Sequence, residues 1–466
     1  MKNFENSIMR GEFRGDFTRD TFHPEKTYSR VLMQQGRVQL DADWNEQVSI
    51  IVHHLRSLAC DVAGPHWGPA EGNGFEIKLT ENKDFSIGAG HYYVNGILCE
   101  NGDGVTYKNQ PNLPNPDDIP ANPNERQALL VYLDVWERHI SAVEDDAIRE
   151  AALGGPDTAS RAKIVWQVKL KTVPSGNIIS NDNTHPFKEN YTDFLAAIAD
   201  DIKTGSGRLA AQAKDRSKTD TEPCLVEPKA RYRGAENQLY RVEIHRPSNS
   251  DGKGATFKWS RENGAVIFPI LERIAGGATL TLEHLGRDER FGLKPDDWVE
   301  VLDDDAILNT NKVNLFQIMM IDPENRQVTL KGIPVSTAGE DSAKHPYLRR
   351  WDQHNGDQDG IPIEIGIGNN VQWIDLEDGI QISFPQDEAK INAYRSGDYW
   401  LIPARQITGD IEWPEQDGKP SPMLPHGVRH HYAPLAIIAS TRRPTTGAAG
   451  ANTVIDLRRI LTRIWV

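Results

Sequence analysis

The chain has few cysteines, and it has no long apolar run. Its 466 residues include three cysteines, Cys60, Cys99 and Cys224, which lie far apart and form no C-x-x-C pair. A disulfide framework or a zinc ribbon is therefore not expected, and we predict buried free thiols in a reducing cytoplasm. Because no stretch of ~18 consecutive apolar residues occurs, we predict no membrane span.

The chain also has no excess of positive charge, and we expect no secretion signal. Its formal net charge is −15 and its pI is about 5.4. A protein whose main task is to grip nucleic acid gathers Lys and Arg to neutralise phosphates, so we expect no nucleic-acid partner. The first thirty residues carry Glu5, Glu12 and Asp16 and no apolar run of signal-peptide length, which predicts cytoplasmic assembly without a signal peptide.

The common catalytic signatures are missing from the sequence. It contains no G-x-S-x-G string, no P-loop, no H-E-x-x-H and no G-x-G-x-x-G after a predicted strand. We therefore predict that the protein is not an enzyme and uses no cofactor. A hydrolase stays an alternative, because glycosidase carboxylates and catalytic triads can be scattered along a chain.

What the sequence does have is a motif-dense segment at residues 14–48, RGDFTRDTFHPEKTYSRVLMQQGRVQLDADWNEQV. Its Gly15-Asp16-Phe17 and His23-Pro24 are typical of turns. Residues 31–38 are expected to be extended, with a break at Gly36. A helix is predicted from Asp41 or Asp43 to about Ala63, where Gly64-Pro65 ends it. Apolar residues recur at helical spacing in it, at Trp44, Val48, Ile51, Val52, Leu55 and Leu58.

The first half of the chain after this helix mixes strands and helices. Alternating apolar and polar residues predict short antiparallel strands within 74–101 and further strands at 127–136 and 162–170. A Pro- and Asn-rich loop is expected at 110–124, a short helix at 145–151 and a mobile link at 214–222. A helical insertion is predicted near 190–215, with Phe194, Leu195, Ile198 and Ile202 on one stripe and a second turn at Leu209–Ala213.

Everything after Arg231 reads as β structure. Ten short runs, from LYRVEIH to YAPLAIIA, are bounded by Gly, Pro, Asn and Asp. This pattern favours sandwiches or small barrels, and the absence of a fixed repeat argues against a solenoid or propeller. We predict a mainly β, multidomain chain with an α+β N-terminal part. The expected domains are 1–70, 71–230, 231–335 and 336–466.

Two groups of residues are candidate metal ligands. Asn355, Asp357 and Asp359 occupy the first, third and fifth positions of a calcium-type loop, but the Glu needed at the twelfth position is missing. His426 and His430 have i, i+4 spacing, yet neighbouring Pro and Gly residues disfavour a helix there. We therefore predict no metal site and keep these five as weak candidates.

Tryptophans could serve as sugar-binding platforms or as core residues. Most of Trp166, Trp259, Trp298, Trp351, Trp373, Trp400 and Trp413 lie in apolar β runs, which favours a core or interface role. Trp351 and Trp413 are expected in polar loops and are the candidates for glycan contact. The core is predicted to include Phe257, Trp259, Trp298, Trp373 and Trp400.

Charged clusters occur at SREN (260–263), RDERF (287–291) and LRRWD (348–352). A catalytic interpretation would use their Arg and acidic side chains to polarise an anion or carbonyl. The structural interpretation, which we favour, is that Arg forks bind carboxylates and hold loops between sheets or across subunit contacts.

A family resemblance extends along most of the chain. It is carried by residues 14–48 and by the segments YLDVWERHISAVEDDAIREAALGGPDTASRAKIVWQVKL, ATFKWSRENGAVI, LGRDERFGLKPDDWVEVLDDD, HPYLRRWDQ and YRSGDYWLIPARQITGDIEWP. The chain resembles the DUF6519 family, whose genes occur in clusters for phage-tail-like contractile injection systems. Its start is also similar to that of phage tail and baseplate proteins. The resemblance implies a structural component of such a particle, near its baseplate, spike or fibre region, which leaves the cell on a released particle.

The partners expected for such a component are other proteins of the particle and copies of itself, as trimers or hexamers. The predicted contact surface is the N-terminal segment, with Phe17, Phe22, Val31, Leu32, Trp44 and Val48. A glycan-binding surface or fibre module stays open as the first alternative and a particle-borne hydrolase as the second.

Overall fold

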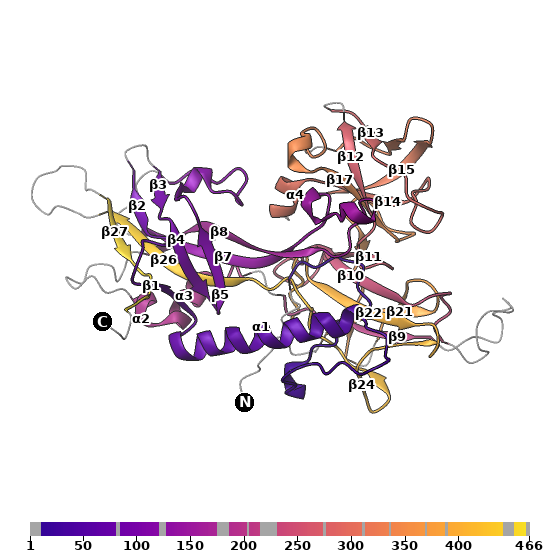
Figure 1. Cartoon of the computed structure of the whole chain (residues 1–466), viewed down its shortest axis with the longest axis horizontal. Helices are drawn as coiled ribbons and strands as arrows, with labels where there is room; N and C mark the ends of the chain where they lie inside the picture. Colours follow the sequence, from indigo (N-terminus) through magenta and orange to yellow (C-terminus); the bar gives the residue numbers. More distant parts are fainter. Residues whose placement is uncertain are drawn as a thin grey trace, which may run out of the picture. The chain divides into compact units, whose positions relative to one another are not determined.

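The computed structural model (Figure 1) describes residues 11–80, 84–120, 127–174, 186–202, 205–214, 231–273, 276–309, 313–334, 337–368, 371–386, 390–440 and 452–462. The chain divides into two compact units, each built from separate segments. The first unit contains residues 1–49, 139–162 and 204–428, and the second contains 50–138, 163–203 and 429–466. The four predicted domains are not tested by this division and stay a prediction.

The N-terminal helix α1 (Asp41–Ala63) is confirmed with the predicted bounds. Gly64 adopts φ +89° and donates its N–H to the Cys60 carbonyl oxygen at 2.8 Å, which ends the helix. The predicted extended run at 31–38 is wrong as a strand, because no described segment pairs with it. Val31 N–H instead donates to the Gln47 side chain at 2.8 Å, and a turn lies at Gly36.

The second unit is a set of small antiparallel sheets with one added parallel strand pair. Its strands are β1 (His66–Pro69), β2 (Ile77–Leu79), β3 (Phe85–Ile87), β4 (Gly90–Val94), β5 (Ile97–Asn101), β6 (Val105–Thr106), β7 (Gln127–Ile140), β8 (Arg161–Pro174), β26 (His431–Ser440), β27 (Asn452–Asp456) and β28 (Ile460–Leu461). They form the orders β28-β1-β4-β5, β2-β3-β6 and β27-β26-β7-β8. The strands predicted within 74–101 and at 127–136 and 162–170 are confirmed.

Two short helices of the second unit, α2 (Pro186–Glu189) and α3 (Tyr191–Ala197), fulfil part of the predicted helical insertion. Asn190 caps α3 by accepting the Thr192 N–H at 3.1 Å. Phe194 and Ile198 are buried against the inner residues of β7 and β26, so the predicted apolar stripe is confirmed. The predicted turn of helix at Leu209–Ala213 is wrong, as described below.

The first unit holds a two-sheet sandwich. One sheet has the order β18-β11-β10-β22-β23, and the other contains β19-β21-β20 with β9 on β21. The strands are β9 (Ala210–Ala213), β10 (Gln238–Arg246), β11 (Thr256–Ser260), β18 (Ile361–Pro362), β19 (Ile365–Ile367), β20 (Ile374–Asp375), β21 (Ile380–Gln386), β22 (Tyr399–Arg405) and β23 (Asp410–Ile411). Side chains of both sheets share one apolar core.

A six-stranded barrel is inserted between strands β11 and β18 of the sandwich in the first unit. It closes in the order β12-β13-β16-β15-β14-β17. Its strands are β12 (Ile267–Arg273), β13 (Thr279–Leu282), β14 (Trp298–Leu302), β15 (Leu315–Asp322), β16 (Gln327–Leu330) and β17 (Tyr347–Trp351), with α4 (Asp304–Leu308) after β14. The mainly β architecture with sandwich and barrel is therefore confirmed. A separate hairpin joins β24 (Glu415–Gln416) and β25 (Lys419–Pro420).

Local predictions failed where tertiary pairing or chain geometry decided the outcome. Leu209–Ala213 contains strand β9 because its Ala-rich run pairs with β21. The predicted helix at 145–151 is two 3-10 turns, Asp146–Ile148 and Ala151–Leu153. The other 3-10 turns are Pro24–Lys26, Tyr107–Asn109 and Ser342–Lys344. Residues 110–120 form no helix or strand, as predicted, while 121–124 and most of the predicted link at 214–222 lie outside the described residues.

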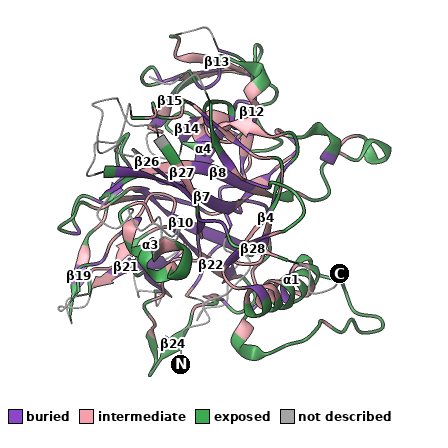
Figure 2. Ribbon diagram, turned by 90° about the vertical axis from the view of Figure 1, so that its left-hand side faces the viewer, coloured by how far each residue is buried: buried purple, intermediate pink, exposed green. Residues whose placement is uncertain are grey.

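The predicted aromatic core is largely confirmed. Phe257, Trp259, Trp298 and Trp400 are buried. Figure 2 shows strands β10 and β14 in purple, the colour of buried residues. The prediction that Trp373 belongs to the core is wrong, because Trp373 lies just before the two-residue strand β20 and is half-buried. Both cysteines that the structure describes are free, Cys99 buried and Cys60 half-buried.

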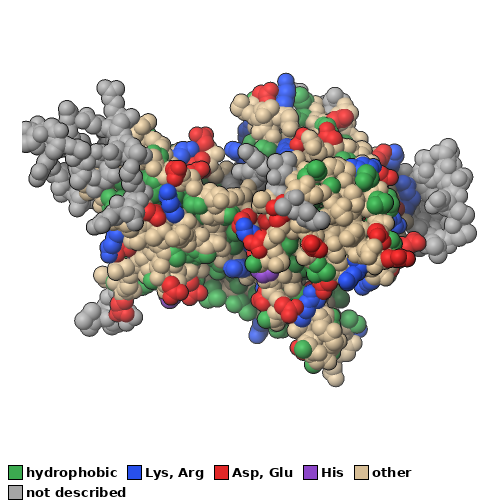
Figure 3. Space-filling model, turned by 90° about the horizontal axis from the view of Figure 1, so that it is seen from above, with side chains coloured by type: hydrophobic (Ala, Val, Ile, Leu, Met, Phe, Trp, Pro, Cys, Tyr) green, Lys and Arg blue, Asp and Glu red, His purple; other side chains and the backbone are tan. Residues whose placement is uncertain are grey.

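The surface is mixed in charge. On the face seen in Figure 3, Asp and Glu side chains lie interspersed with Lys and Arg. Among the described residues, no helix is both long enough and apolar enough to cross a bilayer.

Candidate functional site

Strand β10 is buried on both faces. Tyr240, Val242 and Ile244 point to the sandwich core, whereas the alternate residues Arg241 and Glu243 carry charge and are also buried. A buried charge is tolerated only when partners replace the water it loses. The polar face of β10 is therefore the place where the fold concentrates electrostatic interactions.

Glu243 is the hub of this first ion network. Arg14 donates to both of its carboxylate oxygens at 3.0 Å, and Arg241 Nε donates to Oε2 at 2.6 Å. Lys258, its cross-strand neighbour on β11, lies 3.3 Å away. Burial alone would raise the pKa of Glu243, but the charges of Arg14, Lys258 and Arg241 hold it well below its usual range.

The network continues on both sides of Glu243. Arg14 also pairs with Glu12, and Lys258 pairs with Glu300 of β14. Trp351 Nε1 donates to the Glu300 carboxylate at 2.9 Å. Burial would raise the pKa of Glu300, whereas Lys258 lowers it overall. The N-terminal segment, the sandwich and the barrel of the first unit thus share one set of ion pairs.

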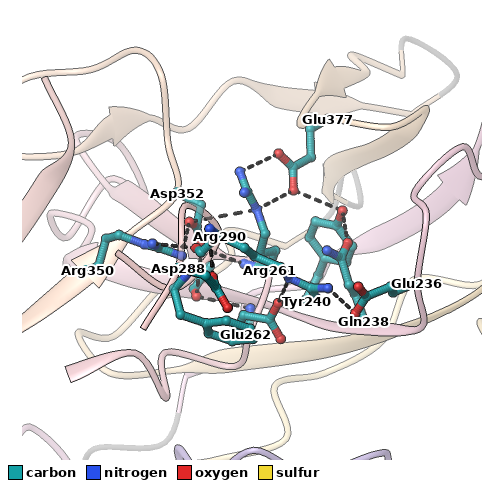
Figure 4. A network of polar contacts seen from close by, with 12 residues as sticks. Glu236, Gln238, Tyr240, Arg261, Glu262, Asp288, Arg290, Arg350, Asp352 and Glu377 are labelled. Carbon is teal, nitrogen blue, oxygen red and sulfur yellow. Dashed lines mark hydrogen bonds and ion pairs between the residues drawn. The ribbon is translucent and has the colours of Figure 1, made fainter. Parts of the chain in front are cut away.

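A second network joins the three charged clusters found in the sequence (Figure 4). Arg261 binds Glu377 with two hydrogen bonds, 2.9 and 2.7 Å, and its backbone N–H donates to Asp352 at 2.9 Å. Arg290 pairs with Glu262 and Glu236. Arg350 lies 3.3 Å from Asp352. The clusters SREN, RDERF and LRRWD are therefore spatial neighbours whose charges are matched to each other.

Glu377 is the carboxyl group of this second network with the largest pKa shift. Burial raises its pKa to about 7, against the opposing charge of Arg261. Tyr240 donates its hydroxyl to the same carboxylate at 3.0 Å. A forked Arg contact of this kind fixes the position of the Glu377 carboxyl group, because both of its oxygens accept hydrogen bonds from Arg261.

Asp398 gives the structure a testable pH dependence. It is buried, it accepts the Arg395 backbone N–H at 3.2 Å, and burial raises its pKa to about 8. The folded chain therefore binds this proton more tightly than the unfolded chain, whose Asp titrates near the ordinary value of 3.8. The stability associated with the bound proton is present at acid pH and is lost as pH rises from about 4 to about 8.

We expect Asp398→Asn to flatten this dependence. The difference in the free energy of unfolding, wild type minus variant, should fall by up to ~1.4 kcal/mol per pH unit across that window. Urea titrations of both proteins at pH 5, 6, 7 and 8 measure it. Parallel curves for the two proteins would show that Asp398 is ionised in the fold.

Helix α1 carries an exposed apolar stripe. It consists of Trp44, Val48, Ile51, Leu55, Leu58 and Val62, whose exposed fractions run from 45% for Val48 to 78% for Val62. The opposite side of the helix is where Ala42, Ser49, Ile50 and Ala63 are buried. Within the segment before α1, Leu32, Val38 and Leu40 are exposed as well. We call the six helical residues the α1 stripe.

A comparison with protein families shows which family the chain is related to. The matching model describes a family of unknown function, DUF6519. This model matches residues 13–177 and 181–443, nearly the whole chain. The chain belongs to the DUF6519 family. No curated protein and no solved structure matches it.

In this DUF6519 chain, the weak metal candidates have protein partners instead of a shared centre. Asp359 accepts from Arg246 at 2.9 Å, and Asp357 accepts the Asp359 backbone N–H at 2.8 Å. His430 lies 2.7 Å from Asp134, and His426 accepts from the Leu401 N–H at 3.3 Å. Over the described part of the chain, no group of three His, Cys, Asp or Glu side chains could hold a metal ion. Asn355 lies in the loop between β17 and β18.

The two glycan candidates differ in exposure. Trp351 was expected in a polar loop, but it ends strand β17 and is 1% exposed, so neither ring face is open to a sugar. Trp413 is half-buried against the sandwich core, and its Nε1 donates to the Ser421 carbonyl oxygen at 3.0 Å. A glycan contact at Trp413 stays a prediction.

The predicted interface residues of the N-terminal segment also separate by burial. Leu32, Trp44 and Val48 are exposed, whereas Val31 is half-buried. Phe22 is 5% exposed, and Phe17 is half-buried with its ring perpendicular to that of His139. The α1 stripe extends the predicted surface to Ile51, Leu55, Leu58 and Val62.

Sequence reasoning missed the Glu243 network in this DUF6519 chain. Its members alternate with core residues in LYRVEIH, ATFKWS and DWVEVL, a pattern that equally describes strands with one face in water. The available signal was a charged residue between apolar positions inside each of these β runs, Arg241 and Glu243 in the first, Lys258 in the second and Glu300 in the third.

Proposed function

We propose that this DUF6519 chain is a non-enzymatic structural component of a phage-tail-like contractile injection particle, at or around the baseplate, spike or fibre attachment region. The sequence resemblance suggests the particle, and the α1 stripe is the observation that carries the association role. Large exposed apolar patches mark interaction surfaces. The chain would assemble in the cytoplasm and reach its mature location on a released particle.

The spacing of the α1 stripe supports a helix as its partner. Successive members are four, three, four, three and four residues apart, which is the a and d pattern of a heptad repeat. Val48, Leu55 and Val62 take the a positions, and Trp44, Ile51 and Leu58 take the d positions. A straight helix keeps such a stripe on one side over about five turns, and supercoiling keeps it against a partner.

A second copy of the same helix fits this stripe. The flanking e and g positions are Asn45, Val52 and Ala59 and Gln47, His54 and Asp61, so identical helices would meet with little like-charge repulsion. The six side chains offer on the order of 700 Å² per copy, close to the ~800 Å² per partner of a standard interface. Copies arranged as a trimer or hexamer would match the closed symmetry of a particle.

We expect the double substitution Ile51→Asp and Leu55→Asp to abolish self-association. Two carboxylates per copy would have to be buried without partners in the seam, which should raise the dissociation constant by at least about a hundredfold. Light scattering coupled to gel filtration measures the molar mass at a series of concentrations. Ser57→Asp, on the same helix but outside the a and d positions, is the matched control.

The proposal requires that the wild type and the control variant are oligomers and that the double variant is a monomer. Circular dichroism should show that the double variant keeps its helical content. A wild-type protein that stays monomeric at high concentration would contradict the self-association part. Oligomers of unchanged mass in the double variant would show that another surface makes the contact.

The charged clusters also support a structural function over a hydrolase. Arg261, Arg290 and Arg350 each lie within 4 Å of a carboxylate of the second network. A general acid or nucleophile needs a carboxyl group that can reach a substrate, and arginine forks instead hold these groups to each other.

A further inference from the structure

A small cavity adjoins the Glu243 network in the first unit. Its volume is about 50 Å³. Its polar lining includes Arg14, His245, Lys258 and Arg349, and an apolar side is formed by Leu302, Ala306, Ile307 and Val313. A single water needs roughly 10–15 Å³ of such space, so the cavity can hold several waters or one small polyatomic ion.

The nitrogen atoms at this cavity lack acceptors. Arg14 Nε, His245 Nε2 and Arg349 Nε are buried and have no hydrogen-bond partner in the described part of the chain. No carboxylate oxygen of Glu12, Glu243 or Glu300 is in that condition, because Arg14, Arg241, Lys258 and Trp351 supply their hydrogen bonds. The lining therefore calls for a group that accepts hydrogen bonds.

The charge balance points the same way. The buried cations Arg14, Arg241, Lys258 and Arg349 face the three carboxylates of Glu12, Glu243 and Glu300. Arg349 is the cation without a carboxylate partner, because it forms no ion pair among the described residues. Its guanidinium donates to the Tyr347 hydroxyl at 3.0 Å and lies over the Tyr347 ring. Burial and the nearby Lys258 lower the pKa of His245 to about 4, so this histidine is neutral at pH 7 and adds no positive charge to the balance.

We propose that this cavity is a binding site for a small oxyanion, held by Arg349, Arg14 and His245. A planar guanidinium presents N–H groups in a geometry that matches oxyanions, and a bound anion would satisfy the free nitrogens and balance the extra positive charge. The shared chemistry covers a tetrahedral inorganic anion, such as phosphate or sulfate, and a small carboxylate. The site is independent of the proposed particle function.

Isothermal titration of the full chain tests the site. Phosphate, sulfate and acetate are titrated separately at pH 7, with sodium chloride matched for ionic strength. We expect one oxyanion per chain for the wild type and an affinity at least about tenfold weaker for Arg349→Met. Arg287→Met is the control, because it removes the same charge from an exposed position of the first unit.

Binding of phosphate or sulfate with loss in Arg349→Met alone supports a tetrahedral anion, and stronger binding of acetate supports a carboxylate. No binding by the wild type, or equal weakening in both variants, overturns the proposal and leaves a water-filled cavity. If Arg349→Met does not fold, Arg349→Lys replaces it. Wild-type crystals soaked in selenate provide the second measurement: an anomalous peak beside Arg349 supports the site, and its absence overturns it.

Discussion

Replacing Trp400 with alanine is expected to lower the free energy of unfolding by roughly 3–5 kcal/mol. Trp400 is fully buried in the sandwich core, where it lies opposite Val242 of β10. Its Nε1 donates to the Met423 carbonyl oxygen at 2.9 Å, so truncation would leave both a cavity and an unpaired acceptor. Trp259→Ala should have a similar cost, because Trp259 packs in the same core.

Urea unfolding followed by circular dichroism measures the loss. The control is Ile407→Ala, because Ile407 is 87% exposed and its truncation should change stability by no more than ~0.5 kcal/mol. Unchanged unfolding midpoints in both core variants would refute the core assignment. That outcome would favour a glycan-binding platform, whose exposed tryptophans affect affinity more than stability.

Glu243→Gln is expected to destabilise the chain by a comparable amount, roughly 3–5 kcal/mol. The substitution keeps the size of the side chain but removes the charge that Arg14, Arg241 and Lys258 share. Arg241 would then lose the carboxylate that it pairs with, and Arg14 and Lys258 would keep only Glu12 and Glu300 as counter-charges. Chemical unfolding at pH 7 is the measurement, and Glu415→Gln, in the exposed hairpin strand β24, is the control.

If the Glu243→Gln variant is as stable as its control, the three cations lose little stabilisation when their shared carboxylate is neutralised. The network would then be solvated. The oxyanion proposal can be separated from this result, because it depends on the nitrogens of Arg349 and His245 and is measured by binding.

The sequence was sufficient for elements whose local pattern agrees with their packing. Helix α1 was predicted with its bounds because capping residues, apolar spacing and Gly64-Pro65 all indicate the same segment. The β runs after Arg231 alternate clearly and formed strands. Leu209–Ala213 was predicted as helix from its alanines, but pairing with β21 overrode that weak preference. Pairing between distant segments cannot be read from local composition.

The functional surfaces were predicted less completely. The exposed part of α1 was anticipated at Trp44 and Val48, because an apolar face on a short N-terminal segment suggested a contact. Phe22, also predicted for that surface, is 5% exposed, and sequence cannot tell an apolar residue that packs inward from one that faces a partner. Arg349 and His245 could not be paired with a cavity, because they lie about a hundred residues apart in sequence and only the closed barrel and sandwich bring them together.

The most direct test of the structural function is whether the chain is part of a particle. An epitope-tagged wild-type chain and the Ile51→Asp, Leu55→Asp double variant are each expressed in place of the natural copy in cells that make the particle. Sedimented particles are then imaged by electron microscopy with gold-labelled antibody. The proposal predicts label at one end of contractile particles for the wild type and little or none for the variant. Particles that carry no label while the wild-type chain stays free in the supernatant would contradict it.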